Sequence, residues 1–166
     1  MQPLLKSSSA TPLGTLNVLL DGRTLVAAGF TTFAELRGKL AIADQERSLT
    51  LSRESKWIEV VIADYFEGDI SAINGLAVRQ PGNDFSQSAW RAMRKIPAGR
   101  VISYAALANK AGSPAAARAA GTACGRNAIA PFIPCHRIVR SDGTLGNYGY
   151  GTTKKSWLLR HEGAID

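Results

Sequence analysis

The pattern of apolar and polar residues in the first half of the chain predicts a small α/β lobe. Two apolar runs are separated by Asp21 and Gly22, a pair typical of the tight turn of a β-hairpin. Further along, apolar side chains recur at the spacing of an amphipathic helix, which ends at Gly68. We therefore expect an antiparallel sheet covered by helices. The predicted strands cover residues 15–20, 24–30 and 73–78, and the predicted helices cover residues 33–42 and 55–66.

The second half of the chain predicts a mostly helical lobe. Turn-forming residues 80–83 separate the halves, so the expected domains are residues 1–80 and 84–166. Asp84 and Ser103 are expected to cap helices, and Ser113 followed by Pro114 marks a further helix start. The last two helices form a helix-turn-helix pattern, and the fold class is α+β. The expected helices cover residues 84–96, 103–110 and 115–125.

The second helix of this pattern has almost no side-chain bulk. Apart from Arg118, residues 115–123 are alanine, glycine and threonine. A helix that reads base edges in the major groove carries long polar side chains, which argues against a conventional transcription regulator. Small residues permit either tight helix packing or a close approach to something narrow, and both interpretations stay open at this point.

Positive charge concentrates in the same half of the chain. The sequence carries 20 Lys and Arg against 13 Asp and Glu, a net charge of +7. Residues 91–140 contain nine cations and no Asp or Glu, which suggests a face built for phosphates. Lys154 and Lys155 lie near the start of a last predicted helix, where the helix dipole disfavours cations; this fits either DNA phosphates or a solvated surface.

The sequence also indicates the cellular compartment of the protein. No run of about 18 apolar residues predicts a membrane span, and the first residues lack the apolar core of a signal peptide. We therefore expect a cytoplasmic protein with two free thiols, Cys124 and Cys135. These cysteines and the two histidines do not have the spacing of a metal site.

Cys135 is the strongest candidate for chemistry. It lies between Pro134 and His136, with Arg137 next, and positive or basic neighbours favour the reactive thiolate. We interpret it as a nucleophile. Cys124 lies in the small-residue helix and is most simply a buried apolar side chain.

These features together resemble the O6-alkylguanine-DNA alkyltransferases, also called methylated-DNA–protein-cysteine methyltransferases, over nearly the whole chain. Residues 9–16 look like the first strand of that family. The resemblance implies DNA repair, in which an alkyl group leaves O6 of a guanine that has been flipped out of the duplex. The densest matches are residues 96–99, 103–104, 116–119, 127, 134–137, 146–148 and 157–163.

The resemblance implies a chemical role for five residues. Cys135 accepts the alkyl group, His136 polarises it through a water, and Glu162 orients His136. Tyr104 helps to rotate the nucleotide and to protonate guanine, and Asn127 ties the helix pair to the turn that carries the nucleophile. The plainer alternatives are a core tyrosine and a simple helix C-cap.

The resemblance also implies how DNA is held. The thin helix would enter the minor groove, only about 6 Å wide, through Ala117, Ala119 and Gly121. Arg118 would fill the gap left by the flipped base, with an ordinary phosphate contact as the alternative. Residues Tyr148, Gly149 and Tyr150 would form the guanine pocket, which Tyr150 is expected to narrow.

An S-alkyl cysteine has no carbonyl to hydrolyse, so each molecule is expected to act once. No cofactor is expected, because the damaged base is itself the alkyl donor. The expected partner is double-stranded DNA carrying O6-alkylguanine, with O4-alkylthymine left open; the expected state is a monomer, with clustering on DNA as an alternative. Three rivals remain: a non-enzymatic alkyltransferase-like protein, a transcription regulator and a cysteine hydrolase. The presence of Cys135 argues against the first, because such proteins lack the nucleophile.

Overall fold

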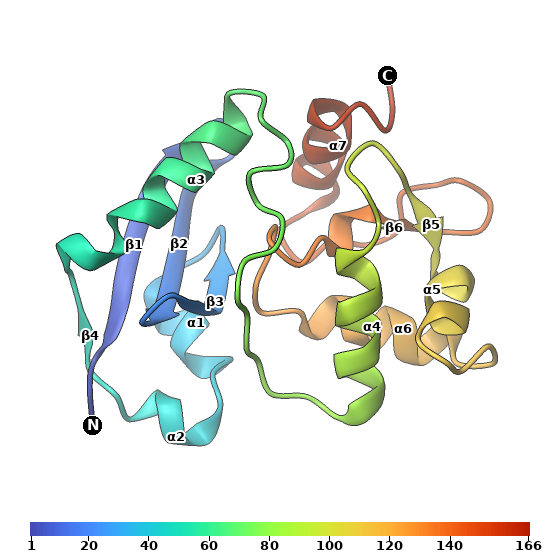
Figure 1. Ribbon diagram of the computed structural model, residues 1–166. Coiled ribbons are helices and arrows are strands. Elements are labelled where there is room, and N and C mark those ends of the chain that lie inside the picture. Colours follow the sequence, from blue (N-terminus) through green and yellow to red (C-terminus); the bar gives the residue numbers. More distant parts are fainter. The chain divides into compact units, whose positions relative to one another are not determined.

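The structure, a computed structural model, describes residues 1–166 and divides them into two compact units (Figure 1). Unit 1 consists of Met1–Pro81 and Ala128–Phe132, and unit 2 of Gly82–Asn127 and Ile133–Asp166. The division near residue 80 lies within the turn-forming segment that the sequence singles out. Residues 128–132 differ from the expected domains, because they belong to unit 1.

The sheet of unit 1 is built from a three-stranded antiparallel meander with one short parallel strand at its edge. Its strand order is β3-β2-β1-β4, and β4 pairs with β1 in parallel, so the sheet is mixed. Residues 9–16, expected to form one strand, instead include the turn between β1 and β2, because Thr11 pairs with Gly14 across it. The strands are β1 Leu4–Thr11, β2 Gly14–Asp21, β3 Thr24–Gly29 and β4 Leu49–Thr50.

Helices flank this sheet. Helix α3 packs on β1, and α1 packs on β2 and β3 (Figure 1). Successive side chains of a strand point to opposite faces of the sheet, so each strand contributes to the packing on both faces. Leu19 joins the core cluster with Leu36 of α1, whereas its neighbours Val18 and Leu20 point to the opposite face. The helices of unit 1 are α1 Phe33–Gly38, α2 Ile42–Gln45, the 3-10 turn η1 Arg53–Ser55 and α3 Lys56–Phe66.

The predicted strand over residues 73–78 is wrong. Only Val78 forms an isolated bridge, with Leu25 of β3. Residues 128–130 instead pair with β3, nearer its end. The Ala28 amide donates to the Ala128 carbonyl at 2.8 Å, and the Ala130 amide donates to the Ala28 carbonyl at 3.2 Å. Gln80 adds a bond from the Ala128 amide to its side-chain oxygen at 2.7 Å. These long-range bonds explain why residues 128–132 belong to unit 1.

Unit 2 is mostly helical. Ser103 caps α5 as predicted, with its hydroxyl accepting from the Ala106 amide. The cap of α4 is Asn83 rather than Asp84, and α6 begins at Ala117, two residues later than expected. None of the helices is long and apolar enough to cross a bilayer. The elements are α4 Asp84–Arg94, β5 Ile102–Ser103, α5 Tyr104–Lys110, α6 Ala117–Arg126, the 3-10 turn η2 Cys135–Arg137, β6 Ile138–Val139 and α7 Thr152–His161.

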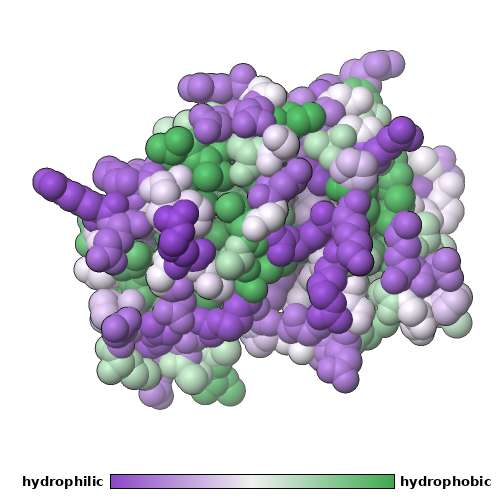
Figure 2. Space-filling view, viewed as in Figure 1, coloured by the Kyte–Doolittle hydropathy of each residue, from purple (hydrophilic) through white to green (hydrophobic).

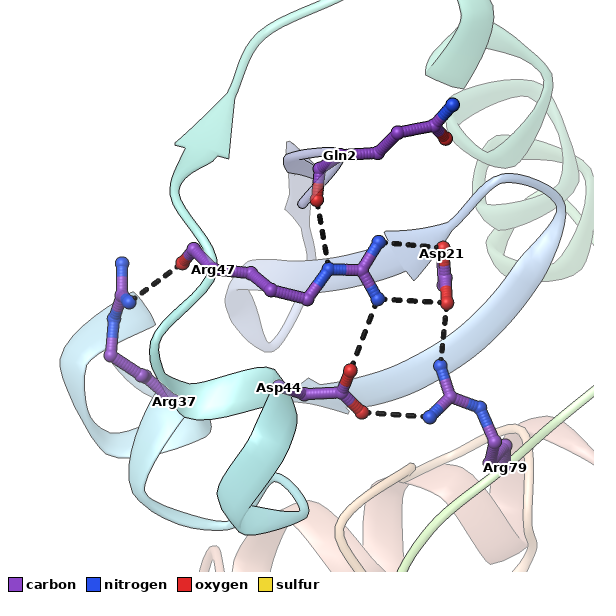
Figure 3. A network of polar contacts seen from close by, with 6 residues as sticks. All are labelled: Gln2, Asp21, Arg37, Asp44, Arg47 and Arg79. Atoms are coloured by element: carbon purple, nitrogen blue, oxygen red, sulfur yellow. Dashed lines mark hydrogen bonds and ion pairs between the residues drawn. The ribbon is translucent and has the colours of Figure 1, made fainter.

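A network of four charged side chains ties together the end of β2, helix α2 and the segment after α3 that carries Arg79 (Figure 3). Arg47 donates to both oxygens of Asp21 at 2.9 Å, to Asp44 at 3.0 Å and to the Gln2 carbonyl at 2.8 Å. Arg79 bridges the same two carboxylates at 2.7 Å. Hydrogen bonds from Arg47, opposed in part by burial, lower the pKa of Asp21. Arg47 is therefore the centre of the network.

Replacing Arg47 by methionine should destabilise the protein by about 1–3 kcal/mol, because several charge-assisted hydrogen bonds are lost together. Denaturant unfolding followed by circular dichroism measures this difference. The matched control is Lys56→Met, which removes one exposed pair with Glu59 and should cost about 0.5 kcal/mol or less. Equal losses in the two variants would show that the network contributes no more than a surface ion pair.

Candidate functional site

Cys135 lies at the wall of a cavity of about 520 Å³ in unit 2. It is the first residue of η2, its amide bonds the Ile133 carbonyl at 2.9 Å, and only 8% of the residue is exposed. The same cavity is lined by Tyr104, Arg118, Gly121, Tyr148 and Gly149. The structure thus brings the candidate nucleophile together with predicted residues from α5, α6 and the loop before α7.

A buried carboxylate organises the residues that follow Cys135. Glu162, the C-cap of α7, accepts from Arg137 Nε at 2.9 Å on one oxygen and from Nη2 at 2.9 Å on the other. His136 Nε2 lies 2.9 Å from the second oxygen. The third nitrogen of Arg137 donates to the Ile96 carbonyl at 2.7 Å. All three side chains are buried, so η2 is fixed to α7 and to the end of the α4 segment at once.

The protonation states of this cluster follow from its geometry. Burial raises the pKa of Glu162, but the hydrogen bonds and charges of His136 and Arg137 outweigh burial and lower it well below the usual range. Burial lowers the pKa of His136, although Glu162 opposes this effect. An ionised carboxylate accepts hydrogen bonds and donates none, so a neutral His136 must carry its proton on Nε2. Its Nδ1, buried and without a protein partner, is then left as the basic atom.

Tyr104, the first residue of α5, also lines the cavity. Burial, followed by the two cysteines, raises the pKa of its phenol, so the hydroxyl keeps its proton. Gly146 allows this placement: its φ is +73°, and a Cβ there would lie 2.9 Å from the Tyr104 oxygen. The hydroxyl is therefore available as a proton donor beside Cys135.

Lys155 is a residue of the site that sequence reasoning misplaced. It is fully buried rather than solvated or available to phosphates, and its Nζ donates to the Ile138 carbonyl at 2.6 Å and to the Asn147 carbonyl at 3.1 Å. Burial lowers its pKa. The signal that could have found it is helical periodicity, since Lys155 precedes the buried Leu158 and Leu159 by three and four residues.

Asn127 does two things at once. It is the C-cap of α6, with its amide bonded to the Cys124 carbonyl, and its side-chain nitrogen donates to the Ile133 carbonyl at 2.8 Å. The end of α6 is thereby tied to the residue whose carbonyl also accepts from the Cys135 amide. Both interpretations of Asn127 from the sequence describe contacts that it makes.

The predicted DNA-contacting residues form the outer side of α6. Ala117, Arg118 and Ala119 are exposed, and Gly121 is half-buried at the cavity wall. Trp90 fixes the opposite side of the helix by donating from Nε1 to the Ala123 carbonyl at 2.9 Å. The exposed side of α6 therefore presents mostly small side chains with two long cations, Arg118 near the start of the helix and Arg126 at its end.

Two predicted neighbours of the cavity lie differently from expectation. Tyr150 does not line it; its ring packs edge-on against Tyr148, with centroids 5.8 Å apart. Cys124 does line it, although it was expected to be only a buried apolar side chain. Burial, and then Cys135, raise the pKa of Cys124 far above its usual range, so Cys124 stays a neutral thiol.

Known proteins resemble both the sequence and the fold. Residues 84–164 match the family described as 6-O-methylguanine DNA methyltransferase, DNA binding domain. The methylated-DNA–protein-cysteine methyltransferase of Salmonella typhimurium is 37% identical over 99% of both chains. The crystal structure of the Mycobacterium tuberculosis O6-methylguanine methyltransferase has a TM-score of 0.77 at 29% identity and covers 100% of this chain and 95% of its own. The Mycobacterium tuberculosis OGT in complex with DNA has a TM-score of 0.80 at 28% identity, with 96% and 93% covered.

Because His136 is buried, we expect the free energy of unfolding to fall on acidification. Because its pKa is lower in the folded state than the value near 6.5 of an unfolded chain, the unfolded state binds an extra proton as pH drops below about 6.5. The free energy of unfolding should then decrease by up to about 1.4 kcal/mol per pH unit. Glu162, whose folded pKa is also lowered, should add a further loss below about pH 4.3.

Denaturant unfolding at a series of pH values between neutral and mildly acidic tests this expectation. His136→Asn should flatten the profile in the His136 window, whereas His161→Asn, which keeps His136, should retain it. Proton-detected titration of the His136 ring in the wild-type protein gives a second measurement. A folded-state pKa at or above 6.5 would contradict the prediction.

Proposed function

The chain belongs to the methylated-DNA–protein-cysteine methyltransferase family, and we propose that it repairs DNA by moving the alkyl group of an O6-alkylguanine onto its own Cys135. The observation that carries the proposal is the one cavity that Cys135, Tyr104 and the small-residue helix α6 line together. Double-stranded DNA is the partner, and the damaged guanine enters the cavity.

The thin surface of α6 supports minor-groove binding. A groove about 6 Å wide admits a helix only if its side chains are small, and Ala117, Ala119 and Gly121 meet that condition. The target atom is stacked inside the duplex, so the nucleotide must be extruded before reaction. Arg118 is exposed and lines the cavity, which supports a role in filling the space that the base leaves. Tyr104 is placed to contact the rotated nucleotide.

The cluster behind Cys135 supports activation of the thiol. The buried Nδ1 of His136 takes the thiol proton, directly or through a water, because Nε2 is committed to Glu162. Sulfur then attacks the alkyl carbon, the new S–C bond forms, and the bond between that carbon and O6 breaks. Tyr104 protonates the departing guanine, and the proton that His136 took from the thiol then returns through water to the Tyr104 phenolate. Guanine leaves neutral and the protein keeps a thioether.

The rim of the cavity supports recognition of the base. Tyr148 and Gly149 line it, so their backbone groups can read the edge of guanine. Tyr150 acts on the pocket through its packing against Tyr148. Asn127 links the helix in the groove to the turn that holds the nucleophile.

Several consequences follow for how the protein works. A thioether carries no carbonyl that water can attack, so each molecule transfers one alkyl group and the damaged base itself is the only donor required. A free thiol needs a reducing compartment, which favours the cytoplasm as the site of action. All the groups named in the reaction come from one unit of one chain, so a single copy of the protein suffices for the transfer.

Intact mass spectrometry after mixing with duplex DNA containing O6-methylguanine tests the reaction. The wild-type protein should gain one methylene, and peptide mapping should place it on Cys135. Cys135→Ser should gain nothing, whereas Cys124→Ser, the matched control for the other thiol of the cavity, should still gain it. Tight binding without a mass change would favour a non-enzymatic lesion-binding protein and would refute the proposal.

Tyr104→Phe separates proton donation from binding. The variant keeps the ring and loses only the hydroxyl, so transfer at saturating DNA should slow by about a hundredfold or more, while affinity for DNA changes little. Rapid-quench measurement of single-turnover alkylation gives the rate. Tyr65→Phe makes the same change in the buried core of unit 1 and should leave the rate as it is. A transfer rate in Tyr104→Phe equal to that of wild type would remove Tyr104 from the chemistry.

A further inference from the structure

A second hollow of unit 2 lies outside the site described above. It is a groove of about 910 Å³ formed by α4, α5 and the segment between them, and we call it the α4–α5 groove. It has no lining residue in common with the cavity around Cys135. Four of its lining residues are cations, and none is an acid: Arg91, Lys95, Arg100 and Lys110.

These four cations are free to meet a ligand. All four are exposed, and none forms an ion pair with a carboxylate. Arg91 makes only a bond to the hydroxyl of Ser88, which also lines the groove. Figure 2, seen from the same side as Figure 1, shows hydrophilic side chains along α4. Four like charges around one groove repel one another, so an anionic occupant would relieve the repulsion.

The spacing of the cations suits a chain of phosphates rather than a single anion. Arg91 on α4 and Lys95, the C-cap of that helix, are one turn apart, about 6 Å along the helix axis. Lys110 ends the seven-residue helix α5, and Tyr104, which faces the flipped nucleotide in the proposed function, begins it. The two ends of such a helix are about 10 Å apart, roughly three base pairs of duplex.

We propose that the α4–α5 groove binds the phosphate backbone of the same DNA duplex, on one side of the flipped nucleotide. The proposal rests on the proposed function, because Tyr104 and α6 fix where the lesion lies. The groove extends the DNA-binding surface beyond the helix-turn-helix in one direction along the duplex. It adds affinity without reading sequence, since its lining offers charge rather than base-edge contacts.

The test compares DNA that extends to the 5′ side of the lesion with DNA that extends to the 3′ side. Two duplexes of equal length carry O6-methylguanine near one end, so that the flanking DNA extends either 5′ or 3′ of the lesion. Arg91→Gln combined with Lys95→Gln should lower the second-order rate of Cys135 alkylation at limiting DNA for only one of them. The expected loss is about fivefold or more at roughly 0.1 M salt. The rate at saturating DNA should stay unchanged.

A matched variant controls for net charge. Arg53→Gln combined with Lys56→Gln removes one exposed arginine and one exposed lysine from unit 1, and it should affect neither duplex. Equal losses on both duplexes, or no loss relative to this control, would overturn the proposal. So would binding of two duplexes by one protein molecule.

A second measurement separates failure of the groove from failure of the repair function. With undamaged duplex, the slope of log affinity against log salt should fall by about 2 in the groove variant, near 0.9 for each lost phosphate contact. If the wild-type protein stays unalkylated but the groove variant shows the reduced salt slope, the alkyl transfer is refuted and the groove proposal stands. An alkylated wild-type protein with an unaltered slope in the variant would refute the groove alone.

Discussion

The ion pair between Glu162 and Arg137, with His136 as its third member, is the interaction on which the candidate site depends. Removing charges from water is costly, and a buried pair persists only where further hydrogen bonds satisfy the remaining atoms. Here both carboxylate oxygens and the third guanidinium nitrogen have partners. The pair therefore fixes η2, with the Cys135 thiol at its start, and it decides which nitrogen of His136 is basic. A glutamine at position 162 would keep the shape of the side chain, but its amide can donate as well as accept, so it would no longer determine which nitrogen of His136 is basic.

The turn that carries Cys135 is held from its other side by the segment before it. Asn127 closes α6 and bonds the Ile133 carbonyl, while residues 128–132 between them pair with β3 in unit 1. Five residues thus leave the helical unit and return directly before the nucleophile. The sheet of unit 1 therefore supplies hydrogen-bond partners for the backbone segment that directly precedes Ile133 and Cys135 in the chain.

Local signals predicted the elements that local bonds stabilise. The hairpin at Asp21 and Gly22 and the cap at Ser103 depend on neighbours within a few residues, and both were recognisable. The segment 73–78 has strand-like residues but finds only one bridge, and residues 128–132 take the neighbouring positions on β3 through bonds about 100 residues apart in sequence. The burial of Lys155 depends on carbonyls from two other segments. Composition alone could not identify such partners.

The distribution of charge makes the same point for function. In sequence, the nine cations of residues 91–140 form one group that predicts a face for phosphates. In the structure this group divides: Arg137 is neutralised inside the protein, Arg118 and Arg140 line the cavity, four others line the α4–α5 groove, and Arg94 and Arg126 line neither. A cation contributes to DNA affinity only where it can displace counterions from a phosphate. Net charge therefore overstates the surface available to DNA, and the positions of the unpaired cations determine in which direction along the duplex that surface extends.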